Sequence, residues 1–186
     1  MSTKRFLARA NLDAKRRRTN SYNMRRNAFS HSPPEVKNRQ TTIGNDFTVS
    51  NTVTFPLTDI AAGSGVSARV GGKIKLKSAF AHLKNPGTTI VRYIMYVPKS
   101  ITDRVALTNQ SDPVDKDLFW VLKDFYIDTR NESAHKNMKQ NFPMGMVVEY
   151  FGGSATDITK NGIYLYAHGA ASGNMSGYHE LWFIDN

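Results

Sequence analysis

The sequence predicts an all-β protein, an eight-stranded antiparallel jelly-roll sandwich preceded by a disordered basic N-terminal arm. Three observations support this prediction. From residue 41 onward, apolar and polar residues alternate with period two, and almost no helical pattern is present. Clusters of Gly, Asn, Pro and Ser divide this pattern into short segments. Lysine and arginine are concentrated ahead of the pattern, in residues 1–39.

The arm carries nearly all of the excess charge. Residues 1–39 hold two acidic residues, Asp13 and Glu35, and have a net charge of +9. Their eleven basic residues are Lys4, Arg5, Arg9, Lys15, Arg16, Arg17, Arg18, Arg25, Arg26, Lys37 and Arg39. Residues 40–186 hold 14 basic and 13 acidic residues, a net charge of +1. Because the arm has few apolar residues to offset the entropy of ordering, it is expected to be disordered, ahead of a shell domain at 40–186.

The predicted strands follow one another along the shell domain. They lie at residues 47–55, 73–77, 90–97, 118–127, 144–151, 163–168 and 178–184. The runs 90–97, 118–127 and 144–151 are apolar or aromatic on both faces, which is typical of strands in the core of a sandwich. Residues 129–142 are compatible with an eighth strand or with a short helix. Long connections after residues 97 and 151 suit the crossings between sheets that a jelly roll requires.

The composition excludes several chemistries. The 186 residues include no cysteine, which excludes disulfides, thiolate metal sites and a cysteine nucleophile. The five histidines are dispersed, without a pair at metal-ligand spacing: His31, His82, His135, His168 and His179. Since no nucleophile–base pair or acid–base dyad is recognisable either, neither an enzyme nor a cofactor is expected. Asp112, Asp115 and Asp117 are candidate Ca²⁺ ligands at a subunit contact, with a solvated acidic loop as the alternative.

The arm is predicted to bind nucleic acid. Each Lys or Arg replaces a counterion on the phosphate backbone, and the arginine fork also stacks on exposed bases, which suits single strands. The alternative is a merely solvated tail. A membrane partner is not expected, because Phe6, Leu7 and Leu12 form only a thin apolar stripe. No signal peptide is expected, because no apolar run follows the first charges.

Two further sets of basic residues are candidates for binding. A nuclear localisation signal is predicted at Lys15, Arg16, Arg17, Arg18, Arg25 and Arg26. Lys73, Lys75 and Lys77 alternate with apolar residues on one predicted strand. These three lysines either extend the polyanion-binding surface or protect an exposed edge strand from pairing with other chains.

The later part of the chain resembles the coat proteins of small icosahedral viruses. FWVLKD (residues 119–124) is similar to a strand in the coat proteins of satellite tobacco necrosis virus and of geminiviruses, which have circular single-stranded DNA. NFPMGMVVEY (141–150) and NGIYLYA (161–167) follow in the same order, and LWFID (181–185) is similar to the final strand of geminivirus coats. The resemblance covers residues 41–186 in pattern and is specific over the last 70 or so.

The resemblance implies a capsid protein that assembles with itself, as sixty copies in a T=1 shell, around a single-stranded genome, with DNA favoured over RNA. It implies location in the virion and, with the import signal, in the host nucleus, where a nuclear import receptor becomes a further partner. The chain is shorter than geminivirus coats and lacks their Cys/His cluster, so their plant-specific roles are not carried over. The alternative is a cellular nucleic-acid-binding β-sandwich that forms no shell.

Overall fold

The computed structural model describes residues 35–48, 52–85, 90–102, 105, 107–128, 134–169 and 174–186. Apart from residues 35–39, the predicted arm and its import signal therefore lie outside the described residues. The strands are β1 (Lys37–Thr48), β2 (Thr52–Pro56), β3 (Lys73–Asn85), β4 (Ile90–Pro98), β5 (Phe119–Asp128), β6 (Ala134–Tyr150), β7 (Ile158–Lys160), β8 (Tyr164–Gly169) and β9 (Asn174–Asp185). No residue of the described part is helical, and so no helix there is able to span a membrane.

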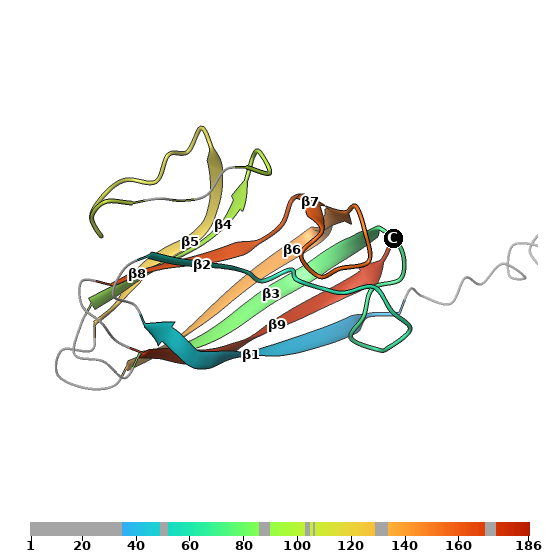
Figure 1. Ribbon diagram of the computed structural model, residues 1–186, viewed down its shortest axis with the longest axis horizontal. Helices are drawn as coiled ribbons and strands as arrows, with labels where there is room; N and C mark the ends of the chain where they lie inside the picture. Colours follow the sequence, from blue (N-terminus) through green and yellow to red (C-terminus); the bar gives the residue numbers. More distant parts are fainter. Residues whose placement is uncertain are drawn as a thin grey trace, which may run out of the picture. The chain divides into compact units, whose positions relative to one another are not determined.

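Two antiparallel sheets are stacked face to face (Figure 1). One has the strand order β1-β9-β3-β6-β7 and the other β2-β8-β4-β5. Most connections cross from one sheet to the other, and β4 and β5 are the one hairpin within the second sheet. Without the three-residue β7, four strands remain in each sheet, and their crossing order is that of a jelly roll. The predicted fold class is confirmed.

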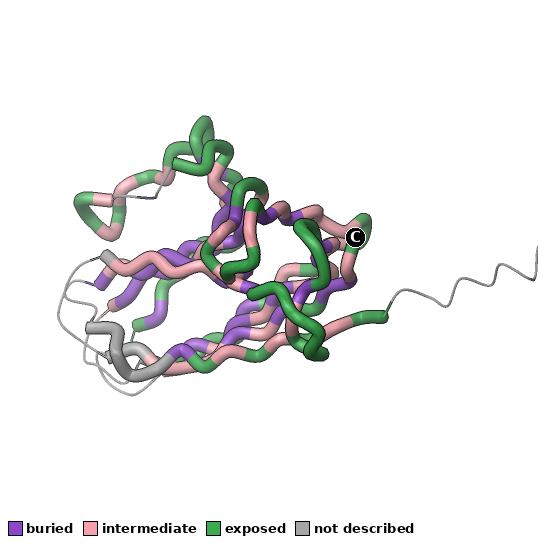
Figure 2. The backbone as a smooth tube through the Cα atoms, turned by 45° about the vertical axis from the view of Figure 1, so that its right-hand side comes forward, coloured by how far each residue is buried: buried purple, intermediate pink, exposed green. Residues whose placement is uncertain are grey.

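The main core fills the space between the two sheets, and Figure 2 shows buried residues, in purple, along strands of both. On β3, Ile74 and Leu76 point into this core. The β-bulge at Lys77 then shifts the alternation by one residue, so that Ala79, Ala81 and Leu83 also point inward. Without the bulge, the second half of β3 would turn its apolar residues to solvent.

A smaller apolar cluster lies on the outer side of the four-stranded sheet. Ile94 and Tyr96 on β4 pack there against Val105, from the long β4–β5 connection, and against Phe119 and Tyr166. The connection therefore covers part of this face, and seven consecutive residues of β4 are buried. This is the burial on both faces that the apolar run at 90–97 predicts.

The other two apolar runs are not buried on both faces, contrary to the prediction. β5 is an edge strand of its sheet, and the side chain of Trp120 is 53% exposed. Met144 and Phe151 lie at the bulge and at the end of β6 and are 90% and 91% exposed. An edge strand and a strand end have neighbours on fewer sides, which is why the same composition leaves these residues at the surface.

Several element boundaries also differ from the sequence prediction. The strand predicted at 47–55 is divided between the end of β1 and most of β2, which belong to different sheets, and β3 continues to Asn85 instead of ending at residue 77. β1 begins at Lys37, before the predicted end of the arm at residue 39. The described part of the ambiguous segment, residues 134–142, is the first half of β6 and not a helix. β7 lies within the predicted loop after residue 151. β1 and β7 are edge strands, each with one neighbour, and their sequences have little apolar alternation to reveal them.

Candidate nucleic-acid interface

Lys73, Lys75 and Lys77 lie on the outer face of the five-stranded sheet. Their strand, β3, pairs with β9 on one side and with β6 on the other. The interpretation that these lysines protect an exposed edge strand is therefore wrong. Since Ile74 and Leu76 between them are fully buried in the core, the lysines point away from it and are exposed or half-exposed. The remaining interpretation, a contribution to a polyanion-binding surface, stays a prediction.

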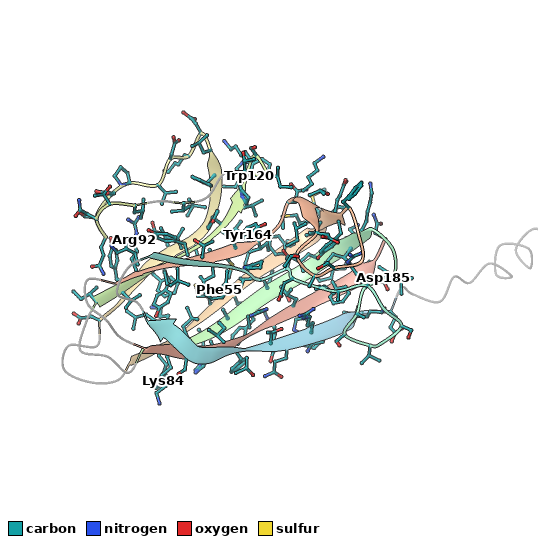
Figure 3. All side chains as sticks on the ribbon, viewed as in Figure 1. Phe55, Lys84, Arg92, Trp120, Tyr164 and Asp185 are labelled. Carbon is teal, nitrogen blue, oxygen red and sulfur yellow. The ribbon has the colours of Figure 1, made fainter. Side chains whose placement is uncertain are left out.

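The structure brings further lysines to the same face. Lys84 follows the three lysines along β3, and Figure 3 shows its side chain projecting away from the sandwich. Lys139 on β6 stands opposite Phe80 in the ladder, and Lys160 on β7 stands opposite Glu149. Lys84 lies beyond the predicted strand at 73–77, on the part of β3 that the prediction left out. Spacing along the sequence does not reveal Lys139 and Lys160, because β6 and β7 join β3 in one sheet only in the folded protein.

Two carboxylates share this outer face. Glu149 accepts a hydrogen bond from Nζ of Lys73, with 3.2 Å between Nζ and Oε1. Glu180 on β9 stands opposite Phe80. Six lysines against two glutamates leave this face with a net charge of +4 among the described side chains. The domain from residue 40 has a net charge of only +1, so its basic character is concentrated on this one sheet.

The β4–β5 connection and β5 carry the opposite balance. Their described residues include five aspartates, Asp112, Asp115, Asp117, Asp124 and Asp128, against three lysines, Lys99, Lys116 and Lys123. The predicted Ca²⁺ candidates are among them. Asp112 Oδ2 accepts hydrogen bonds from the N–H groups of Thr108 and Asn109, and Asp115 Oδ1 accepts one from the N–H of Asp117. Within the described residues no group of three His, Cys, Asp or Glu side chains is arranged to hold a metal ion.

Lys37 and Arg39, the last two basic residues of the predicted arm, lie within β1. Nζ of Lys37 is 2.7 Å from Oδ2 of Asp185 and donates a hydrogen bond to the carbonyl of Ala68 at 2.9 Å. Nη2 of Arg39 is 3.5 Å from Oδ2 of Asp59. Both charges are therefore balanced by acids of the sandwich. The other nine basic residues of the arm lie outside the described residues.

The structure also places histidines beside groups that sequence spacing does not reveal. His82 and His135, on neighbouring strands of the five-stranded sheet, have ring centroids 5.9 Å apart. His179 is 3% exposed, and its Nε2 is 3.8 Å from Oδ1 of Asp59. His31 is outside the described residues.

The sequence matches no family model and no curated protein. Among solved structures, one of desmodium yellow mottle tymovirus matches with a TM-score of 0.37 and 14% identity, covering 81% of this chain and 89% of that chain. A structure of the 60-mer BFDV capsid protein matches with a TM-score of 0.36 and 11% identity, covering 81% and 91%. TM-scores and identities this low carry no argument about function, so the function is argued below from the residues of the chain itself.

Proposed function

We propose that this chain is a viral capsid protein that assembles into a small icosahedral shell and packages a single-stranded genome through its basic arm. The shell has sixty copies in a T=1 arrangement, and the genome is DNA. The role is structural and not catalytic. The jelly-roll topology supports this proposal, as does the resemblance of residues 119–185 to coat proteins.

The observation that carries the proposal is the distribution of charge. Residues 1–39 hold a net charge of +9, and the remainder holds +1. Within the sandwich, the basic face is the outer face of the five-stranded sheet, while the described residues of the β4–β5 connection and β5 hold five aspartates against three lysines. A shell protein needs this separation, because one side neutralises the genome while the other surfaces contact neighbouring copies or solvent. We therefore assign the lysine-bearing sheet to the genome side of the shell.

The charge of the arm also limits the size of the genome. Residues 1–34, which precede β1, hold nine basic residues and Asp13, a net charge of +8, so sixty arms bring 60 × 8, about 480, positive charges into the shell. Because other counterions share the neutralisation, this number suits a genome on the order of 10³ nucleotides. A compact single-stranded genome meets this condition.

Size-exclusion chromatography with negative-stain electron microscopy tests the assembly. The expected result is hollow particles about 20 nm across, eluting far ahead of a 20.9 kDa monomer. The competing function is a cellular nucleic-acid-binding module with a basic tail. It predicts a stable species of one to four chains at neutral pH and low salt, and this outcome would overturn the capsid proposal. If the nucleic acid extracted from the particles resists deoxyribonuclease and is digested by ribonuclease, the assignment of the genome as DNA is overturned and the capsid proposal stands.

The proposed locations are the virion and, during infection, the host nucleus. Four consecutive basic residues, Lys15, Arg16, Arg17 and Arg18, precede Arg25 and Arg26, a pattern that import receptors recognise. A reporter fused to residues 1–39 is expected to accumulate in nuclei, and Ala at positions 16–18 is expected to disperse it. Nuclear accumulation that is unchanged by these substitutions would contradict the assigned signal.

A further inference from the structure

A row of aromatic rings crosses the outer face of the five-stranded sheet. The rings of Tyr178 on β9 and His82 on β3 are stacked, with centroids 5.3 Å apart and planes 22° apart. Phe80 lies on one side of this pair, 5.9 Å from Tyr178, and His135 lies on the other, 5.9 Å from His82. We call these four residues the aromatic row. They come from three neighbouring strands and stand on the side away from the core.

Polar and charged groups surround this row. Lys139 is opposite Phe80, and Lys84 is opposite His135, so a cation stands near each end. Oδ1 of Asn137 accepts a hydrogen bond from Nδ1 of His82, with 2.6 Å between the two atoms. Among the described residues, a carboxylate also lies beside the row, that of Glu180, which is opposite Phe80. His135 is exposed and the other three rings are partly exposed, so the row is accessible from solvent.

We infer that the aromatic row is a second nucleic-acid site, which stacks the bases of a single strand while the neighbouring lysines bind its phosphates. Rings on a basic sheet face are the arrangement with which proteins hold single strands without regard to sequence, since every base has a face to stack. A duplex has no free base faces to offer, apart from its ends. The row therefore distinguishes single strands from duplexes, which a flexible basic arm cannot do by charge alone.

This inference deepens the proposed function and rests on its nucleic-acid-binding part, but not on the formation of a shell. It assigns the arm and the sheet different tasks. The arm supplies affinity that depends steeply on salt, and the aromatic row supplies affinity that persists when salt is raised, because stacking releases few counterions.

Photochemical cross-linking of the full chain locates the site directly. The probe is a thymidine homo-oligomer containing 5-iododeoxyuridine, irradiated with the protein at elevated salt, and cross-linked tryptic peptides are identified by mass spectrometry. The tryptic peptide of residues 78–84 contains both Phe80 and His82. Cross-links in this peptide, or at Tyr178 or His135, are expected with the single strand and absent with a duplex of equal length.

The outcomes separate this inference from the proposed function. Binding with cross-links confined to residues 1–39 would overturn the aromatic row and leave the arm and the capsid intact. No binding of the oligomer by the full chain would overturn both nucleic-acid assignments. Equal cross-linking of single strands and duplexes at the row would overturn the stacking mechanism.

Substitutions separate stacking from a purely structural role of the rings. Tyr178→Leu is expected to weaken binding of the oligomer at elevated salt about tenfold. Tyr178→Phe, which keeps the ring, is expected to retain the affinity. The matched control is Trp120→Leu, at an exposed aromatic residue of the other sheet. If the leucine variant at 178 binds as tightly as wild type, or the phenylalanine variant as weakly as the leucine variant, the inference fails.

A lysine pair completes the test. Lys84→Gln removes an exposed cation beside His135, and Lys123→Gln removes an equally exposed cation from the four-stranded sheet. The first substitution is expected to weaken binding of the oligomer several-fold and to reduce its dependence on salt, and the second to change neither. Equal effects of the two would indicate general attraction to the protein and contradict a site on this face.

Discussion

The guanidinium of Arg92 on β4 meets the carboxylate of Asp124 on β5 through two hydrogen bonds, Nε to Oδ1 at 2.9 Å and Nη2 to Oδ2 at 2.6 Å. Nη1 of Arg92 also donates to the carbonyls of Gln110 and Asp112 in the β4–β5 connection. The arginine side chain is 7% exposed. Its hydrogen bonds with Asp124 raise the pKa of Arg92 above its ordinary value. One cation thus links two strands and fastens the connection over the sheet.

Asp124→Asn should test the strength of this link. The substitution removes the countercharge of a nearly buried guanidinium, and we expect it to lower the free energy of unfolding by about 2–3 kcal/mol. Urea unfolding followed by circular dichroism measures the difference. The control is Asp117→Asn, at an exposed aspartate of the same connection, which should change stability by less than about 0.5 kcal/mol. Equal effects of the two substitutions would contradict the role given to Arg92.

Tyr93→Phe should stabilise the protein. The Tyr93 ring stacks on Phe125 with 5.7 Å between ring centroids, but its buried hydroxyl has no hydrogen-bond partner among the described residues. Removing an unsatisfied buried group is expected to raise the free energy of unfolding by about 1 kcal/mol at pH 8. Chemical unfolding of both proteins at that pH measures the gain.

The same variant should show a characteristic dependence on pH. Burial raises the pKa of Tyr93 in the folded protein above its ordinary value of 10.0. Tyr93 therefore ionises at a lower pH in the unfolded chain than in the folded protein. As a result, the free energy of unfolding of the wild-type protein keeps the full contribution of Tyr93 below pH 10 and loses it as the pH rises above 10. Phenylalanine does not titrate, so the free energy of unfolding of Tyr93→Phe should exceed that of wild type by about 1.4 kcal/mol more at pH 11 than at pH 8. An advantage that stays constant over this range would contradict the prediction.

Gly177→Ala should weaken the pairing of β9 with β3. Gly177 has φ of +156°, and a Cβ atom there would overlap the carbonyl oxygen of His82 on the neighbouring strand. Because that oxygen belongs to the backbone, relief requires the strands to separate locally, and we expect a loss of about 3 kcal/mol in the free energy of unfolding. Gly153→Ala is the matched control, since a Cβ at 153 meets nothing within 4 Å. Thermal unfolding of the two variants gives the comparison.

The arm should be removable up to Pro34 but not beyond the start of β1. Deleting residues 1–34 removes nine of the eleven basic residues predicted to bind nucleic acid. This truncation is expected to leave the sandwich folded and to abolish packaging, measured as the ratio of absorbance at 260 and 280 nm in purified material. Nucleic acid that still copurifies at physiological salt in the amount seen with the full chain would contradict the assignment to the arm.

A longer deletion, of residues 1–39, provides the comparison. It also removes Lys37 and Arg39, with their ion pairs to Asp185 and Asp59, and the first three ladder positions of β1. We expect this protein to have a lower melting temperature than the 1–34 truncation. Equal melting temperatures would show that the start of β1 contributes nothing to the sheet.

The pattern within single strands was readable from the sequence. Alternation of apolar residues predicted the first five residues of β3, and the continuous apolar run at 90–97 predicted a strand buried on both faces. The strand predicted at 163–168 corresponds to β8. β7 and the start of β1 were missed, because short edge strands bury few side chains and so leave a weak pattern. The bulge at Lys77 was not visible either, because a shift in register belongs to a pair of strands.

The sequence by itself determined that the chain is all-β and that its charge is divided between a basic arm and a nearly neutral body. Only the tertiary structure decided that β3 lies inside a sheet, and that its lysines share a face with Lys139 and Tyr178 from distant parts of the chain. The physical reason is that alternation records which face of its own strand a residue occupies. Which strands become neighbours is decided by how the whole chain buries its apolar faces.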